Sequence, residues 1–166
     1  IRSYYARDAV VVFPPVDIER FHPVDEPDDY YLVVSRLVPY KRIDIAVEAF
    51  TRLGLPLKVV GDGRDREALE VEAGDNISFL GWVPDEELPE IVSRCRGFIF
   101  PGREDFGLAP VEAQAAGRPV IAYRAGGALD TVIEGVTGTF FDQATADSLI
   151  EALTSFNPES ISPEAC

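Results

Sequence analysis

The side chains of this sequence best placed for chemistry are two glutamates that bracket the segment Glu104-Asp-Phe-Gly-Leu-Ala-Pro-Val-Glu112. The apolar run at 97–101 predicts a buried strand, and 108–116 predicts a helix whose first turn accepts Pro110, because the first amides of a helix have no partner. Glu104 is then expected on the loop after the strand and Glu112 about one turn into the helix, both pointing toward the helix N-terminus. This pattern indicates a small-molecule site, although a solvated acidic loop before an ordinary helix has the same sequence features.

The backbone of the same turn is expected to supply groups that bind anions. The amides of Phe106, Gly107 and Leu108 fall at the start of the predicted helix, where amides are free and the helix dipole favours negative charge. Gly107 also allows the backbone to approach a ligand closely. The turn is therefore predicted to bind phosphate.

A second loop, Ser35-Arg-Leu-Val-Pro-Tyr-Lys-Arg42, carries positive charge after the first predicted strand. Lys41 and Arg42 lie at the start of a predicted helix, where the helix dipole makes a cation unfavourable, and a bound anion would remove that conflict. Arg36 and Lys41 together could hold a diphosphate, the arginine through its planar fork and the lysine as a point charge. The alternative is a solvated loop with incidental charges.

The loop Gly61-Asp-Gly63 is similar to the first half of a dinucleotide-binding fingerprint. Arg66 occupies the place of the third glycine, and the fingerprint belongs in the first strand-helix turn, which here has no glycine. Binding of a nicotinamide or flavin dinucleotide is therefore disfavoured, although Gly61 and Gly63 remain candidates for lining a base or sugar.

Two further loops are candidates for the same lining. Gly81-Trp-Val-Pro84 could border a base pocket with Trp82 and Val83, although Trp82 fits a core or an interface better than a stacking platform. Gly126 and Gly127 offer unhindered amides, and a tight turn explains the pair almost as well.

The elements that must position these loops alternate along the chain from about residue 30. Strands are predicted at 31–35, 57–60, 77–80, 97–100, 119–122 and 138–141. Helices are predicted at 42–53, 64–72, 86–93, 108–116, 128–134 and 144–156. Apolar strands that alternate with helices predict a doubly wound, Rossmann-like α/β domain: a parallel sheet of about six strands with helices on both faces. Ligands of such domains bind at the carboxyl ends of the strands, near the point where strand order reverses.

The chain is expected to divide into three parts. Residues 1–28 are interpreted as the end of a neighbouring N-terminal domain and a linker, with a helix end at 1–9, a strand at 10–13 and a break at Pro14-Pro15. Residues 29–156 form the Rossmann-like domain, and 157–166 are expected to start another helix. Because the chain contains no methionine and ends there, it is expected to be a fragment.

Composition excludes several classes of function. With 166 residues, 46% of them hydrophobic, and a net charge of -14, the chain should fold as one soluble domain that repels nucleic acid and anionic lipid. Cys95 and Cys166 support neither a disulfide nor a metal cluster, and His22 has no second histidine for a metal site or a catalytic triad. No long apolar span or signal peptide is present, so a cytoplasmic location is expected.

Taken in order, these motifs resemble the C-terminal nucleotide-sugar domain of GT-B glycosyltransferases, specifically the retaining family 4 enzymes. The resemblance covers essentially the whole chain and rests on Pro14-Pro-Val-Asp17 with Phe21, Arg36 with Lys41, Gly61-Asp-Gly63, Gly81-Trp-Val83, Glu104 to Glu112, and Gly117-Arg-Pro-Val120. Within the family, the chain is most similar to bacterial O-antigen mannosyltransferases. Ser35, Asp105 and Asp130 depart from the commoner pattern of the family.

The resemblance implies roles for the candidate residues. Arg36, Lys41 and the amides of 106–108 would hold the donor diphosphate, Glu112 would accept the ribose diol, and Glu104 would face the sugar ring as the catalytic carboxylate. Transfer would retain the anomeric configuration without metal or cofactor. GDP-mannose is the expected donor, and a glycan or lipid-linked molecule the expected acceptor.

The resemblance also implies that half of the site is missing, because GT-B active sites lie between two domains. The isolated chain is therefore expected to be inactive, and the full-length enzyme could be peripheral at the inner face of the membrane. A GT-B UDP-sugar epimerase is an alternative, but it needs histidines that the lone His22 does not supply. A non-catalytic nucleotide-binding module is a third interpretation, disfavoured because Arg36, Lys41, Glu104 and Glu112 are all present.

Overall fold

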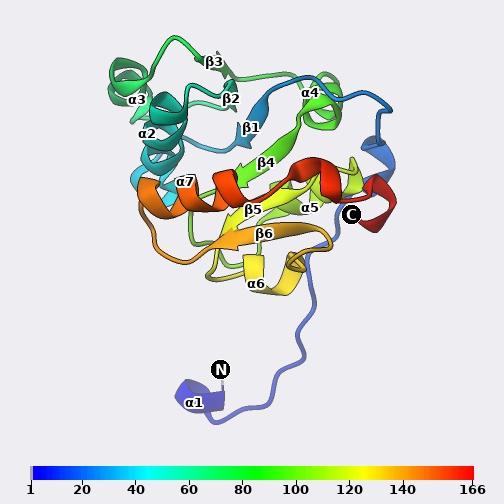
Figure 1. Ribbon diagram of the computed structural model, residues 1–166. Coiled ribbons are helices and arrows are strands. Elements are labelled where there is room, and N and C mark those ends of the chain that lie inside the picture. The colour runs from blue at the N-terminus through cyan, green and yellow to red at the C-terminus, as the bar shows by residue number, and fades with distance from the viewer. Residues whose placement is uncertain (1) are drawn as a thin grey trace.

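The computed structural model describes residues 2–166, in which six parallel strands form one sheet in the order β3-β2-β1-β4-β5-β6 (Figure 1). The strands are β1 Tyr31–Val34, β2 Leu57–Val60, β3 Ile77–Gly81, β4 Gly97–Phe100, β5 Val120–Tyr123 and β6 Gly138–Phe141. Strand order reverses between β1 and β4, which pair in parallel with Tyr31 opposite Gly97. The predicted doubly wound sheet is thus confirmed, and each predicted strand agrees with the structure to within one residue at either end.

Helices cover both faces of this sheet (Figure 1). They are α2 Ile43–Leu53, α3 Arg66–Glu72, α4 Leu88–Arg94, α5 Leu108–Ala115, α6 Ala128–Thr131 and α7 Ala146–Ser155. One core cluster joins α2, α3 and α7 to alternate strand residues such as Val33 and Ile99, and a second joins α4, α5 and α6 to their neighbours, such as Leu32 and Phe98. Because each strand is buried on both sides, the strands are apolar throughout, as the sequence predicted.

Helix α2 shows how the sequence positions an element of the site. Its residues Ile43, Ala46, Val47 and Phe50 are all buried, as their spacing along one helical face predicted. Phe50 is fully buried and packs edge-on against Tyr31 of β1 with 5.2 Å between ring centroids. This contact fixes the helix against the strand whose carboxyl end leads into the loop of Lys41.

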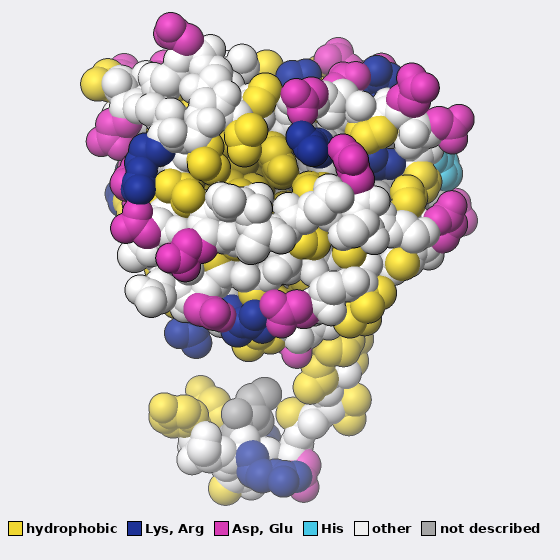
Figure 2. Space-filling model, viewed as in Figure 1, with side chains coloured by type: hydrophobic (Ala, Val, Ile, Leu, Met, Phe, Trp, Pro, Cys, Tyr) yellow, Lys and Arg dark blue, Asp and Glu magenta, His cyan; other side chains and the backbone are white. Residues whose placement is uncertain are grey.

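The strand predicted at 10–13 was wrong. These residues pair with no strand in the described part of the chain and belong to an N-terminal segment that runs away from the sheet, with hydrophobic side chains along it (Figures 1 and 2). Their side chains are exposed, with Val10 at 89% and Phe13 at 59%. A β-strand needs a neighbour to satisfy its backbone groups, so a strand-like sequence alone does not form one. The structured part of the helix end predicted at 1–9 is the single turn α1, Arg2–Tyr5, and residue 1 lies outside the described residues.

Two predicted helices were also wrong in extent. Residues 157–166 form two short 3₁₀ helices, Pro158–Ser160 and Pro163–Ala165, because the residue before a proline is driven out of the α-helical conformation, as at Ser162. The helix predicted at 128–134 ends at Thr131, where the chain turns. The hydroxyl of Thr137 there accepts a hydrogen bond from the amide of Ile133.

Candidate active site at the strand-order reversal

The loops that follow β1 and β4 meet at the carboxyl edge of the sheet, where strand order reverses. Nζ of Lys41 lies 2.5 Å from Oε2 of Glu104, and only 15% and 20% of the two side chains are exposed. Gly102 lets the loops approach, since a Cβ atom there would lie 2.8 Å from the carbonyl oxygen of Lys41. The structure therefore brings together two candidate residues that lie on separate loops in the sequence.

Local backbone structure sets the position of Lys41. The segment Pro39–Lys41 forms a 3₁₀ turn that proline favours at its start, and Arg42 follows in the left-handed region at φ 54°. Arg42 thus precedes helix α2 instead of starting it, which corrects the predicted boundary. Its guanidinium lies 2.9 Å from Asp44. Because Glu104 and Asp44 already neutralise Lys41 and Arg42, the charge conflict expected here does not by itself require a bound anion.

Arg36, on the same loop, remains available for a ligand. Its side chain is exposed and forms no hydrogen bond or ion pair with any other residue of 2–166. Tyr40 is 62% exposed, and its ring lies 5.3 Å from Nζ of Lys41. The loop therefore presents Arg36 as a cation without a partner in residues 2–166, and two paired cations, Lys41 and Arg42, together with an exposed aromatic ring.

The start of helix α5 supplies the free amides that the sequence predicted. Gly107 is the N-cap residue at φ 87°, and a Cβ atom there would lie 2.7 Å from the ring of Phe100. Within residues 2–166, the backbone amides of Phe106, Gly107 and Leu108 donate no hydrogen bond. Free amides and the helix dipole favour an anion at this point.

Glu112 lies on the same helix but in different surroundings from Glu104. Its side chain is partly buried, and burial raises the pKa of its carboxyl group, while Arg20 lowers it and Asp85 raises it. Arg20 also donates a 2.5 Å hydrogen bond to the carbonyl oxygen of Asp85. No sequence pattern pointed to Arg20 or Asp85, because residues so far apart in the chain become neighbours only through packing of the fold.

The two carboxylates accordingly border different surfaces. Glu104 lines a small hollow with Tyr40, Arg103 and Phe106, whereas the charges that influence the pKa of Glu112 are those of Arg20, on the 3₁₀ helix Ile18–Arg20, and Asp85, on the loop after β3. The two glutamates thus have different charged neighbours, although both lie at the same edge of the sheet.

Gly61 and Gly63 allow two loops to pack backbone against backbone. A Cβ atom at Gly61 would lie 1.9 Å from the carbonyl oxygen of Ser35, and one at Gly63 would lie 2.2 Å from that of Leu37. The amide of Leu37 donates to Asp62 across this contact at 3.0 Å. These glycines therefore support the loop of Lys41, whatever they contribute to a ligand.

Trp82 and Val83 differ in their surroundings. For Trp82 the sequence favoured a place in the core or in an interface. Because its side chain is 75% exposed, it does not belong to the core of this chain. Val83 is partly buried and packs against the core cluster that includes α4 and α5. The exposed indole leaves a flat apolar surface at the same edge of the sheet as Glu112.

Gly126 and Gly127 contact the loop of Glu104 directly. The amide of Gly127 donates a 2.8 Å hydrogen bond to the carbonyl oxygen of Glu104, so it is not free for a ligand as the sequence suggested. This contact explains why the turn carries two glycines.

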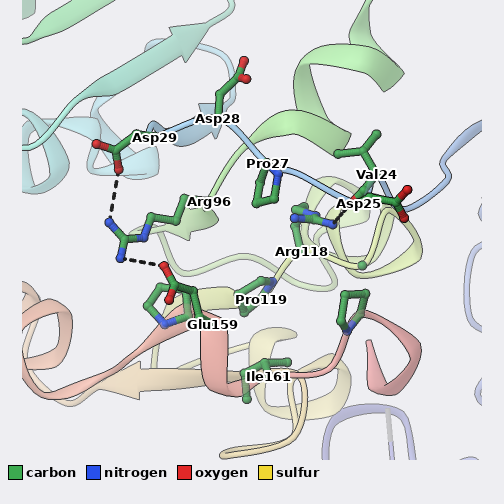
Figure 3. A pocket seen from close by; sticks show the side chains of 13 residues that line it. Val24, Asp25, Pro27, Asp28, Asp29, Arg96, Arg118, Pro119, Glu159 and Ile161 are labelled. Atoms are coloured by element: carbon green, nitrogen blue, oxygen red, sulfur yellow. Dashed lines mark hydrogen bonds and ion pairs between the residues drawn. The ribbon is translucent and has the colours of Figure 1, made fainter.

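A separate cavity lies at the opposite, amino edge of the sheet (Figure 3). Arg96 there pairs with Asp29 at 3.1 Å and Glu159 at 3.3 Å. Arg118 is 4% exposed and donates to the carbonyl oxygens of Ala116 and Val24. The guanidinium groups of this cavity are thus engaged in holding the linker and the C-terminal residues, and the candidate site remains at the carboxyl edge.

Among the His, Cys, Asp and Glu side chains of residues 2–166, no cluster of three or more is arranged to hold a metal ion. Over the same residues, none of the helices has the length and apolar character needed to cross a membrane.

The strand order and the loops at its reversal define the chain as a doubly wound, Rossmann-like α/β domain. Residues 17–166 match the family model of Glycosyl transferases group 1, so the chain belongs to that family. It corresponds to the C-terminal domain of the GT-B fold in that family.

Relatives and a solved structure agree with this assignment. A GDP-mannose-dependent alpha-(1-6)-phosphatidylinositol monomannoside mannosyltransferase of Mycolicibacterium smegmatis is 34% identical over 172 residues, covering 84% of this chain and 44% of that protein. A 2-deoxystreptamine glucosyltransferase of Streptomyces kanamyceticus is 42% identical over 110 residues, covering 60% and 28%. The structure of Anabaena HepE in complex with UDP and glucose superposes with a TM-score of 0.77 at 23% identity, covering 88% and 46%. The chain thus spans less than half the length of these proteins.

Proposed function

We propose that this chain is the donor-binding half of a retaining glycosyltransferase that transfers mannose from GDP-mannose to a glycan or lipid-linked acceptor. The observation that carries the proposal is the meeting of Lys41 and Glu104 at the strand-order reversal, beside the unpaired amides at the start of α5. A cation and free amides fit a diphosphate, and a carboxylate at the same place fits a sugar in which positive charge develops.

In the proposed complex, Arg36, Lys41 and the amides of 106–108 hold the diphosphate. Transfer breaks the bond between the anomeric carbon and the phosphate oxygen, so the leaving nucleoside diphosphate gains negative charge. The two cations and the helix end stabilise that charge, which is the role that a metal ion fills in other enzymes. Glu104 faces the sugar ring, where its carboxylate stabilises the positive charge near the anomeric carbon.

The nucleoside is assigned to the neighbouring surface. The side chain of Glu112 is partly buried and makes no hydrogen bond or ion pair within residues 2–166, so its carboxylate oxygens are available to accept the ribose diol. Asp85 lies on the same loop as Trp82 and Val83, and its charge influences the pKa of Glu112. We therefore assign this loop to binding of the base. The acceptor and its binding residues belong to a second domain, which the proposal places outside this chain.

The choice of GDP-mannose rests on relatives. Mannosyltransferases whose names specify GDP-mannose are about one-third identical to this chain, and they include one of Corynebacterium glutamicum at 34% over 140 residues. The glucosyltransferase relative keeps a different hexose open as an outcome of the test.

Calorimetric titration of the chain with GDP-mannose, UDP-glucose and ADP-glucose tests the proposal. GDP-mannose should bind at least tenfold more tightly than the other two. A preference for UDP-glucose would overturn the mannosyl assignment and leave a hexosyltransferase donor site, whereas no binding of any donor would overturn the site itself.

We further propose a cytoplasmic location, with no nucleic-acid partner and no membrane contact by this domain.

A further inference from the structure

The loop of Glu104 is held from two sides. On one side Lys41 forms its ion pair with the Glu104 carboxylate. On the other side the turn Gly126-Gly127, which leads from β5 into α6, packs against the backbone of residues 104–106. The proposed function needs both the carboxylate and the amides of this loop in fixed positions, so whatever fixes the loop also sets the site.

The contact with the glycine turn involves backbone atoms that cannot rotate away. The Gly127 amide donates to the Glu104 carbonyl oxygen at 2.8 Å. A Cβ atom at Gly126 would lie 2.2 Å from that same oxygen, and one at Gly127 would lie 2.3 Å from both Cα and the carbonyl oxygen of Phe106. Any side chain at either position would therefore push the loop away from the turn.

Backbone conformation alone explains only one of the two glycines. Gly126 has φ +63°, a left-handed conformation that favours glycine. Gly127 has φ -63° and ψ -18°, which every residue adopts readily. A side chain is thus excluded at Gly127 because it would collide with the backbone of Phe106. A substitution at Gly127 therefore tests the contact with the loop without adding backbone strain.

We propose that Gly127, with Gly126, is a positioning residue for the donor site: it seats the 104–106 backbone so that the Glu104 carboxylate reaches Lys41 and the α5 amides face the diphosphate. This role rests on the proposed function. It differs from lining the base or sugar, because Gly127 acts through Glu104 and Phe106 instead of touching the donor.

The test uses Gly127→Ala, with Gly135→Ala as the matched control. Gly135 lies in the connection between α6 and β6 with φ +76°, and a Cβ atom there would meet nothing within 4 Å. Gly126→Ala is the second variant. Because Gly126 and Gly135 both have a left-handed conformation, Gly135→Ala shows how much of the effect of Gly126→Ala comes from backbone strain alone. Each variant is compared with the unchanged chain at a temperature below all melting transitions.

The first readout needs no ligand. Lys41 and Lys58 are the only lysines of the chain, so ¹³C labelling at lysine Cε gives two signals that can be assigned with Lys41→Arg. Gly127→Ala should shift the Lys41 signal, because the loop carrying Glu104 moves, and should leave that of Lys58 in place. Gly135→Ala should move neither. An unchanged Lys41 signal in Gly127→Ala would overturn the seating role.

The second readout is calorimetric affinity for GDP. Gly127→Ala should weaken binding at least tenfold, and Gly135→Ala by less than twofold. Equal affinities in these two variants would overturn the link to the donor. If neither Gly126→Ala nor Gly127→Ala folds while Gly135→Ala does, the proposal also fails, because the turn would then support the core instead of the site. If the unchanged chain binds no nucleotide, the proposed function fails, while the lysine signals still decide whether Gly127 seats the loop.

Discussion

Lys41 and Glu104 lie on the loops after two adjacent strands, and their side chains form a 2.5 Å ion pair that is mostly shielded from water. If Lys41 binds the donor diphosphate, the Glu104 carboxylate competes with that diphosphate for the same ammonium group. The pair thus holds the Lys41 ammonium group in place, at a cost in affinity for the nucleotide.

Glu104→Gln should therefore tighten GDP binding by about three- to tenfold, which corresponds to roughly 0.6 to 1.4 kcal/mol, because the charge that competes for Lys41 is removed. Calorimetry of the chain measures this. Asp105→Asn is the matched control, because it removes the same charge from the neighbouring exposed residue, which makes no ion pair within residues 2–166. Weaker GDP binding by Glu104→Gln than by the control would show that the carboxylate does not compete.

Arg36→Ala and Lys41→Ala should each weaken GDP binding by about ten- to hundredfold, because hydrogen bonds to charged groups contribute roughly 1.5 to 3 kcal/mol. Thermal unfolding should change little for Arg36→Ala, since an exposed cation contributes about 0 to 1 kcal/mol to stability. Lys41→Ala should lower the melting temperature more, because it leaves the shielded Glu104 carboxylate without its partner. Arg52→Ala is the control, because Arg52 pairs with Glu48 and Asp147 on the helices α2 and α7. Affinities like that of the control in both variants would remove the diphosphate role.

Glu112→Gln should raise the melting temperature of the donor-free chain at pH 7, on the order of 2 °C, and much less at pH 4. Burial raises the pKa of Glu112 above its unfolded value, so the folded state favours the protonated carboxyl group. The protonated Glu112 carboxyl group stabilises the folded state at pH values below the pKa that Glu112 has in the unfolded chain. This stabilisation is lost as the pH rises through the pKa of Glu112 in the folded chain. Glu151→Gln on the exposed face of α7 controls for net charge, and an equal gain in both variants would contradict the prediction.

The same Glu112→Gln change should weaken GDP binding only through the ribose. We expect an affinity loss of about tenfold for GDP, because one charge-assisted hydrogen-bonding partner is removed. The loss should be much smaller for 2′,3′-dideoxy-GDP, which has no diol for Glu112 to accept. Calorimetry with both nucleotides decides the point, and equal losses would mean that Glu112 acts elsewhere than on the ribose.

The chain by itself should transfer no mannose from GDP-mannose to mannoside or lipid acceptors, even where it binds the donor. Half a cleft neither positions an acceptor nor excludes water from the anomeric carbon. Radiolabelled donor provides the assay, with hydrolysis to free mannose counted separately. Efficient transfer by residues 1–166 alone would refute the assignment of the acceptor site to another domain.

The sequence by itself determined the elements of the sheet and the loops that carry chemistry. Runs such as Gly97–Phe100 are apolar throughout because both faces of the strand are covered, and the α2 stripe has the helical spacing of a buried face. Periodicity reports whether a residue is buried, so strand-like residues at 10–13 were predicted as a strand although no neighbour pairs with them. A backbone partner is a property of the fold, which no local pattern contains.

Only the tertiary structure decided which of these loops meet. The order that puts β1 beside β4 brings Lys41 to Glu104, and the neighbouring β5–α6 turn brings Gly127 to the Glu104 carbonyl group. It also separated the environment of Glu112 from that of Glu104 by placing Arg20 and Asp85 near the former. These relationships depend on strand order and loop packing, which arise from contacts between distant segments. The spacing of side chains along the chain does not predict such contacts.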